Sequence, residues 1–214
     1  MTSNQEHKGS GDNVGRDKTE THVHHYPEGY QKPIGLDSPK IQVSKLPHTN
    51  NQLFGREDEL AMLDAAWDSP RTNILTIKAM GGSGKTALMK TWMGNLARDD
   101  FRGANAVYTD SFYLQGFSEN TQASADEFFD ATLQWFGYQG ELIPSAHDKG
   151  LKLAELINQQ RSLILLDGLE PLQYPPGGAM GGALRDQGLK TLFQQLAAQN
   201  KGLLVILHVR ILLS

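Results

Sequence analysis

The sequence contains no cysteine in its 214 residues. A chain without thiols excludes a disulfide framework, a thiolate zinc site and a cysteine nucleophile. It also lacks a large excess of either charge, because its 20 Lys and Arg against 24 Asp and Glu give a slightly acidic formal net charge of −4. This balance argues against a dedicated binder of nucleic acid or of anionic membranes, although it leaves room for a local basic patch.

Long hydrophobic runs are also missing. The residues after Met1 are polar, and no apolar stretch typical of a secretory signal follows them. The longest apolar run, residues 203–213, contains His208 and Arg210 and is too short to span a bilayer. We therefore expect a cytoplasmic protein with no membrane partner.

Residues 1–50 contain few hydrophobic side chains and show no sustained helical or alternating period. Such a segment buries too little apolar surface to fold by itself, so we predict a flexible polar tail. Within it, His22, His24 and His25 could place imidazoles on one face for a metal ion, but no carboxylate or cysteine completes a ligand set. We therefore favour a solvated tail, with zinc as the alternative.

From residue 51 to residue 214, short apolar runs alternate with runs of helical periodicity. This alternation predicts a three-layer α/β domain, in which helices cover both faces of a mostly parallel sheet. The expected strands are residues 73–78, 106–112, 162–166 and 203–207, and the expected helices are residues 57–67, 86–96, 124–136, 148–159 and 189–199. Ser124 and Glu127 have the spacing of a capping box. The glycine-rich residues 176–182 are predicted to be a surface loop.

A glycine-rich sequence with the Walker A pattern separates the first expected strand from its helix. Residues 79–86 read Ala-Met-Gly-Gly-Ser-Gly-Lys-Thr. Glycines allow backbone angles that turn consecutive N–H groups toward a phosphate, and the following helix adds its N-terminal dipole. Lys85 is expected to contact the β- and γ-phosphates, and the Thr86 hydroxyl to ligate Mg²⁺. The residues of this region expected to bind nucleotide are Gly81, Gly82, Ser83, Gly84, Lys85, Thr86 and Ala87.

A second element of NTPase chemistry follows about eighty residues later. Four apolar residues, 163–166, lead into Asp167, which is the arrangement of a Walker B strand. The carboxyl edge of a parallel sheet is where α/β proteins bind ligands, so Asp167 is expected to hold Mg²⁺ together with Thr86. Glu170 is interpreted either as the acid that polarises the attacking water or as an ordinary loop residue. Lys85, Asp167 and Glu170 form the predicted catalytic set.

Together the motifs resemble the STAND class of signal-transduction ATPases, which includes the NB-ARC and NACHT groups. Residues 53–60, Leu-Phe-Gly-Arg-Glu-Asp-Glu-Leu, look like the segment that precedes the nucleotide fold in that class, and residues 165–170 resemble a NACHT-type Walker B. The resemblance spans roughly residues 50–207. It implies a P-loop NTPase fold, ATP or ADP with Mg²⁺ as ligands, and Arg56 near the adenine side of the site. It also implies slow hydrolysis as a switch, with self-association or signalling proteins as partners.

The resemblance breaks off toward the C-terminal end. Arg210 falls at least one residue away from the place where the class has an arginine that senses the γ-phosphate, and the next core strand does not follow. We therefore expect a truncated nucleotide module, with a sheet that is incomplete at its C-terminal end. Three alternatives are a module that binds nucleotide without turnover, an AAA-like ATPase acting on DNA, and a degraded fragment with an exposed last strand. The absence of a basic stripe argues against nucleic acid.

Overall fold

The computed structural model describes residues 39–43, 55–112, 125–175 and 179–209. Five parallel strands form one sheet in the order β1-β3-β4-β5-β2. The strands are β1 (Lys40–Gln42), β2 (Ile74–Ala79), β3 (Ala106–Ser111), β4 (Ser162–Asp167) and β5 (Leu203–Val209). The helices are α1 (Glu57–Asp68), α2 (Lys85–Arg98), α3 (Asp126–Trp135), α4 (Ala146–Ile157) and α5 (Gln187–Ala198), with 3₁₀ turns η1 (Asp100–Gly103) and η3 (Glu170–Leu172).

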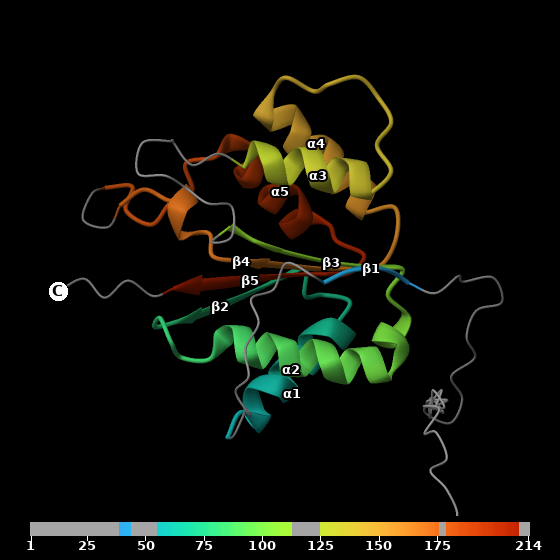
Figure 1. The fold of residues 1–214 in the computed structure, drawn as a ribbon, viewed down its shortest axis with the longest axis vertical. Helices are drawn as coiled ribbons and strands as arrows, with labels where there is room; N and C mark the ends of the chain where they lie inside the picture. Colours follow the sequence, from blue (N-terminus) through green and yellow to red (C-terminus); the bar gives the residue numbers. More distant parts are fainter. Residues whose placement is uncertain (1–38, 44–54, 113–124, 176–178, 210–214) are drawn as a thin grey trace, which may run out of the picture.

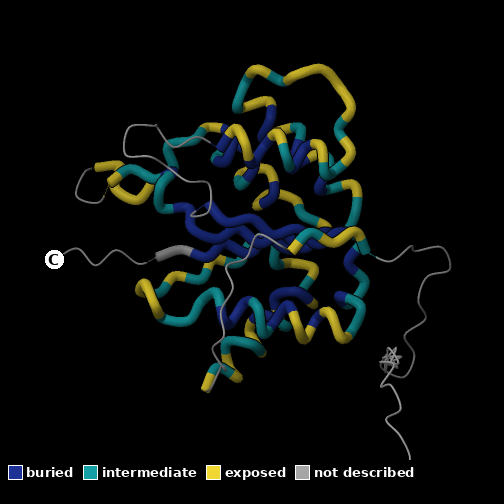
Figure 2. Tube along the Cα trace, viewed as in Figure 1, coloured by how far each residue is buried: buried dark blue, intermediate teal, exposed yellow. Residues whose placement is uncertain are grey.

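Helices cover both faces of the sheet, with α1 and α2 on one side and α3, α4 and α5 on the other (Figure 1). The central strand β4 explains this layering, because all six of its residues are buried. Leu163 and Leu165 pack into the core beneath α1 and α2, whereas Ile164 and Leu166 pack into the core of the other face. A strand that is apolar on both sides requires cover on both sides. Figure 2 shows the resulting buried centre, and the predicted three-layer α/β fold is confirmed.

A fifth strand lies in the segment that the sequence analysis assigned to the tail. β1 pairs in parallel with β3, with Ile41 opposite Val107. The Lys40 ammonium donates to the backbone carbonyl of Trp135 and lies 4.6 Å from the centre of its ring. The prediction of an unpacked tail is therefore wrong for Lys40–Gln42. Ile41 is 46% exposed, so backbone pairing rather than apolar burial holds the strand, and three residues give no period to detect.

Helix α3 begins later than its sequence pattern predicts. Its N-cap residue is Ala125, and Glu127 takes the second helical position, so the predicted capping box does not form. Ser124 lies outside the described residues. The backbone N–H of Ala125 donates instead to the carboxylate of Asp186 at 3.2 Å, and the same carboxylate caps α5 through the N–H of Leu189 at 2.9 Å. A residue 61 positions away takes the place of the local cap, which no local pattern could indicate.

The strand order places the glycine-rich loop and Asp167 at one edge of the sheet. β5 lies between β2 and β4 and pairs with both in parallel. Because all three strands run in the same direction, the loop after β2 and the end of β4 emerge at the same carboxyl edge. The described part of residues 176–182 forms turns with exposed side chains, as predicted for a surface loop. Within the described ranges, no helix is both long and apolar enough to cross a membrane.

Candidate functional site

The glycine-rich loop adopts backbone angles that side chains disfavour. Gly82 has φ +74° and Gly84 has φ +82°, and an added Cβ at either position would meet no atom within 4 Å. Glycine is therefore required here because of the positive φ angles and not because a side chain would clash with neighbouring atoms. Gly84 is the N-cap of α2, and the first helical hydrogen bond runs from the N–H of Leu88 to its carbonyl at 2.8 Å. The N–H groups of the first helical turn have no carbonyl partner within the helix, so they are donors suited to an anion.

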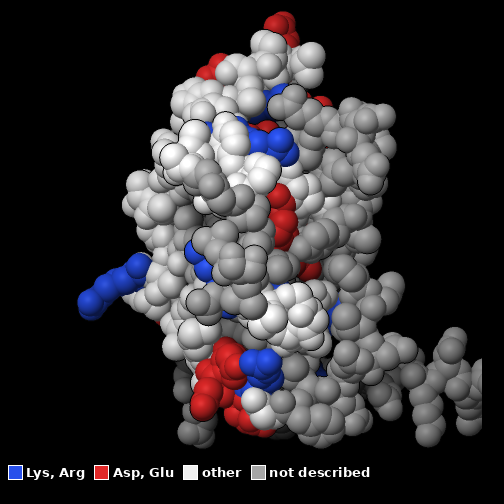
Figure 3. Space-filling view, turned by 90° about the vertical axis from the view of Figure 1, so that its left-hand side faces the viewer, with Lys and Arg blue, Asp and Glu red and all other residues white. Residues whose placement is uncertain are grey.

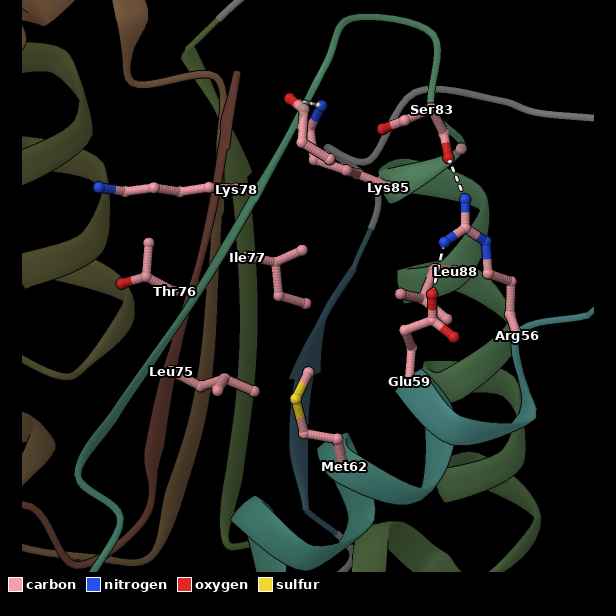
Figure 4. Close-up of a pocket in the computed structure, with 12 residues that line it drawn as sticks. Arg56, Glu59, Met62, Leu75, Thr76, Ile77, Lys78, Ser83, Lys85 and Leu88 are labelled. Atoms are coloured by element: carbon pink, nitrogen blue, oxygen red, sulfur yellow. Dashed lines mark hydrogen bonds and ion pairs between the residues drawn. The ribbon is translucent and has the colours of Figure 1, made fainter. Parts of the chain in front are cut away.

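Lys85 lies back over this loop. Its ammonium donates to the carbonyl of Ala79 at 3.1 Å (Figure 4) and to the carbonyl of Met80 at 3.0 Å. An ammonium has three donors, and these two contacts hold its charge at the carbonyls of the loop. The loop is closed further by the N–H of Ser83, which donates to the Met80 carbonyl at 3.2 Å. These contacts hold the predicted phosphate-binding lysine at the helix N-terminus.

Thr86 and Asp167 meet across the sheet edge. The Thr86 hydroxyl donates to Asp167 Oδ2 at 3.2 Å, which joins two residues 81 positions apart. Asp167 is only 4% exposed. Burial raises the pKa of this carboxyl above its ordinary value, and the charge of Glu170 raises it further, while the Thr86 hydroxyl, Lys85 and the N–H of Gly168 act in the opposite direction. The fold thus keeps a carboxylate where its negative charge is costly, which favours a cation beside it.

The oxygen donors at this edge fit a magnesium ion. Mg²⁺ prefers hydroxyl and carboxylate oxygens, and it is usually bound through one or two protein groups with water and substrate phosphates in its other positions. Thr86 and Asp167 supply two such oxygens. In the described ranges, no cluster of three or more His, Cys, Asp or Glu forms a metal cage. The donor set therefore suits a metal shared with a phosphate rather than one held by the protein alone. His22, His24 and His25 lie outside the described residues.

Glu170 begins the 3₁₀ turn that follows β4. The chain reverses at Gly168, which has φ +74°, and η3 then starts at Glu170. Glu170 follows Asp167 by three residues, and its charge contributes to the raised pKa of that carboxyl. The two acids of the predicted catalytic set are therefore at the same sheet edge, and Ala87, the last residue of the predicted phosphate-binding set, is buried in the first turn of α2.

Arg56 ties the glycine-rich loop to α1. Its guanidinium donates to the Ser83 carbonyl at 3.0 Å and to the carboxylate of Glu59 at 2.5 Å. Glu59 has a lowered pKa, mainly because it accepts this hydrogen bond. The resemblance to STAND ATPases implies that Arg56 lies at the adenine side of the site. The structure gives it contacts with the loop backbone at the rim of a cavity, and Leu53 and Phe54 of the same motif lie outside the described residues.

The cavity beside Arg56 has a volume of about 330 Å³ and lies between β2 and the helices α1 and α2. Leu75 and Ile77 of β2 point into it, and Met62 of α1 faces them, whereas Thr76 and Lys78 point to the other side of the strand (Figure 4). The cavity continues to Ser83, Gly84 and Lys85 of the loop. This apolar wall is not predictable from the run 73–78, because the run does not show that β2 lies at the edge of the sheet. The edge position is what leaves one side of these residues uncovered.

Figure 3 faces the edge at which the strands end. Positive and negative side chains are interspersed over the described part of this face, and negative ones gather at its lower end. The first turn of α1 lies there and carries Glu57, Asp58 and Glu59. The described surface around the site therefore carries mixed charge. Arg210, the residue compared above with a γ-phosphate sensor, lies outside the described residues.

Comparisons with known proteins add little to this geometry. No protein-family model matches the chain, and no curated protein matches it. Among solved structures, it is similar to the structure of C. elegans PCH-2, with a TM-score of 0.37 and 16% sequence identity. The similarity covers 73% of this chain and 38% of the PCH-2 chain, so it spans less than half of the length of the PCH-2 chain. A similarity of this size carries no argument about function. The function of the site must therefore be inferred from the geometry of the glycine-rich loop, Thr86 and Asp167.

Proposed function

We propose that this chain binds ATP or ADP with Mg²⁺ and hydrolyses ATP slowly, as the nucleotide switch of a STAND-class signalling ATPase. The observation that carries the proposal is the 3.2 Å contact between the Thr86 hydroxyl and Asp167. A glycine-rich turn alone occurs in many proteins. A glycine-rich loop that opens a helix, and whose first-turn threonine meets a buried carboxylate of a neighbouring strand, is the arrangement expected for Mg-nucleotide.

The residues divide the work of nucleotide binding between them. The N–H groups at the start of α2 and the Lys85 ammonium would bind the phosphates, because both are positive and both lie at the loop. Thr86 and Asp167 would hold Mg²⁺, which neutralises charge on the phosphate oxygens when it is bound. The cavity walled by Leu75, Ile77 and Met62 begins at the same loop, so it is the proposed place for the nucleoside.

Hydrolysis needs a base for the attacking water, and Glu170 is the proposed group. It follows the magnesium ligand Asp167 by three residues and lies close enough to influence its pKa. A carboxylate in this place can accept a proton from water as the water attacks the γ-phosphate, and ADP and inorganic phosphate leave. Glu170→Gln keeps the size and hydrogen bonding of the side chain but removes the base. We expect it to keep ATP affinity and to lower phosphate release by about 10²-fold or more.

The first test is binding of a fluorescent ATP analogue in the presence of Mg²⁺, with the wild type and Lys85→Ala compared, followed by phosphate release on the same samples. Binding that is lost in Lys85→Ala supports the phosphate loop. Phosphate release that is lost in Glu170→Gln supports turnover, whereas binding without any release by the wild type supports the alternative of a nucleotide-binding module. A folded wild type that binds no nucleotide contradicts the proposal.

A further inference from the structure

A second polar side chain faces the proposed magnesium site from the neighbouring strand. In the register of β3 and β4, Ser111 pairs with Asp167. Residues paired across neighbouring strands direct their side chains to the same face, and this face alternates along each strand. Val107 and Leu163 form an earlier pair, four residues before in each strand, and both pack beneath α1 and α2. Ser111 therefore lies on the face from which Thr86 reaches Asp167.

The Ser111 hydroxyl is buried without a hydrogen-bond partner among the described residues. The residue is 1% exposed, and its Oγ makes no hydrogen bond there. Buried polar groups in native proteins nearly always have a partner, so an orphan hydroxyl calls for one. On its other side, Asp167 pairs with Leu207 of β5, which is apolar. Ser111 is thus the polar in-register neighbour of the proposed magnesium ligand.

We infer that the Ser111 hydroxyl accepts a hydrogen bond from a water molecule in the coordination shell of Mg²⁺ at Thr86 and Asp167, an inference that rests on the proposed function. Magnesium keeps several waters when the protein supplies one or two ligands. A bound cation polarises these waters and makes them strong hydrogen-bond donors. The Asp167 carboxylate already accepts from the Thr86 hydroxyl and from the N–H of Gly168, so it has donors without Ser111. Ser111 is therefore a positioning residue, and it acts through water on the metal.

The experiment measures the affinity of the whole chain for a fluorescent ATP analogue as Mg²⁺ is added. The increase in affinity that Mg²⁺ causes, called tightening below, is compared with the affinity measured in EDTA. Removal of a group that orients a metal ligand typically costs 10- to 100-fold in metal affinity. We expect Ser111→Ala to raise the Mg²⁺ concentration for half-maximal tightening by about tenfold. The affinity in EDTA should stay within about twofold of the wild type, because no phosphate contact is lost. Ser111→Thr keeps the hydroxyl and should restore the wild-type midpoint.

Two further variants make the result decisive. Ser162→Ala removes another fully buried serine hydroxyl, at the opposite end of β4, and should change neither quantity. Ser111→Cys keeps the volume but gives a much weaker hydrogen bond, so it should behave like Ser111→Ala and serves the test if the alanine variant does not fold. The inference is overturned if Ser111→Cys keeps the wild-type midpoint, or if it weakens binding equally in Mg²⁺ and EDTA. A wild type whose binding does not depend on Lys85 would instead overturn the proposed function.

Discussion

The two ends of the sheet differ in the kind of polar group that they leave unsatisfied. At the amino end, Arg161 donates to the carbonyls of Trp67 at 3.0 Å and Arg102 at 3.2 Å, and its guanidinium lies 4.1 Å from the centre of the Trp67 ring. At the carboxyl end, Asp167 is buried with a raised pKa and the Ser111 hydroxyl has no partner among the described residues. Both ends have a cavity of about 330 Å³, so volume alone does not identify the site. The amino end leaves the buried indole N–H of Trp67 without a hydrogen-bond partner among the described residues, whereas the carboxyl end buries a carboxylate next to an orphan hydroxyl. This combination of groups distinguishes the carboxyl end.

This difference has a physical meaning. An arginine whose donors reach backbone carbonyls and whose plane covers an aromatic ring stabilises the fold and has little left to offer a ligand. A buried carboxylate and an orphan hydroxyl both cost free energy in the protein alone, and such costs concentrate where a ligand repays them. Substitutions at the amino end should therefore lower stability and leave binding intact. Substitutions at the carboxyl end should do the reverse.

The largest effect is expected at Lys85. Replacement of Lys85 with alanine removes the only side-chain ammonium that contacts the loop carbonyls in the described structure, and with it a charge-assisted contact to phosphate. We expect the affinity for ATP to fall by about 100-fold or more, which corresponds to roughly 3 kcal/mol, while the melting temperature without nucleotide changes little. The matched control is Lys78→Ala, which removes an exposed lysine of β2 that points away from the cavity. Equal losses in both variants would show a general effect of charge.

The second effect tests the amino end. Arg161→Ala removes two hydrogen bonds to backbone carbonyls and the contact with the Trp67 ring. We expect the free energy of unfolding to fall by about 2 kcal/mol, measured by denaturant titration, with ATP affinity unchanged. Lys201→Ala, at an exposed residue lining the same cavity, should stay within about 0.5 kcal/mol of the wild type. A loss of ATP affinity in folded Arg161→Ala would contradict the division between the two ends.

The third effect concerns the charge of Asp167. Because burial raises the pKa of this carboxyl, its ionised form destabilises the fold, and the cost is absent at low pH and grows as the pH rises above the ordinary aspartate value. Asp167→Asn removes the charge, and its amide oxygen still accepts from Thr86. We expect a higher melting temperature than the wild type at pH 7, a difference that vanishes in acid, and a loss of about tenfold in the Mg²⁺-dependent part of ATP affinity. An unchanged Mg²⁺ dependence would remove Asp167 from the metal site.

Sequence alone predicts those parts of this molecule that local patterns determine. The apolar run 163–166 followed by Asp167, and the Gly-Lys-Thr sequence after a strand, suffice to predict β4, β2 and the contact of Thr86 with Asp167. The sequence does not reveal which strands are neighbours, and two missed features of the site depend on that. The edge position of β2 opens the cavity, and the pairing of β3 with β4 brings Ser111 to Asp167.

Other features escape because their partners are distant in the chain. β1 is held by pairing with β3, which lies more than sixty residues away, and the start of α3 is held by Asp186. Arg161 likewise gains its role from Trp67, 94 positions earlier. None of these contacts leaves a period or a motif in the sequence around the residue itself. Local sequence patterns thus determine the glycine-rich loop and Asp167. The cavity beside β2 and the long-range contacts that hold the fold depend on the topology.

The smallest effect separates two roles for Arg56. The resemblance to STAND ATPases implies a contact with the adenine side, whereas the structure shows its guanidinium holding the Ser83 carbonyl of the loop. Loss of one such hydrogen bond in Arg56→Ala is worth about 1 kcal/mol, which corresponds to a fewfold loss in ATP affinity. The two roles differ in what else is affected. If Arg56 shapes the loop, affinity for inorganic tripolyphosphate falls by the same factor as affinity for ATP, because both bind through phosphates.

A contact with adenine predicts the opposite result, since tripolyphosphate has no base and its affinity should then be unchanged in Arg56→Ala. Glu59→Gln is the matched control for the loop role. It removes the negative charge next to Arg56 and leaves the hydrogen bond to the Ser83 carbonyl available, so phosphate binding should stay near that of the wild type. Competition of ATP and tripolyphosphate against fluorescent ATP measures the wild type and both variants on one scale. Because the Arg56 side chain is partly exposed, water can replace its hydrogen bond, which is why this effect ranks below that of the buried Asp167 at the same end of the sheet.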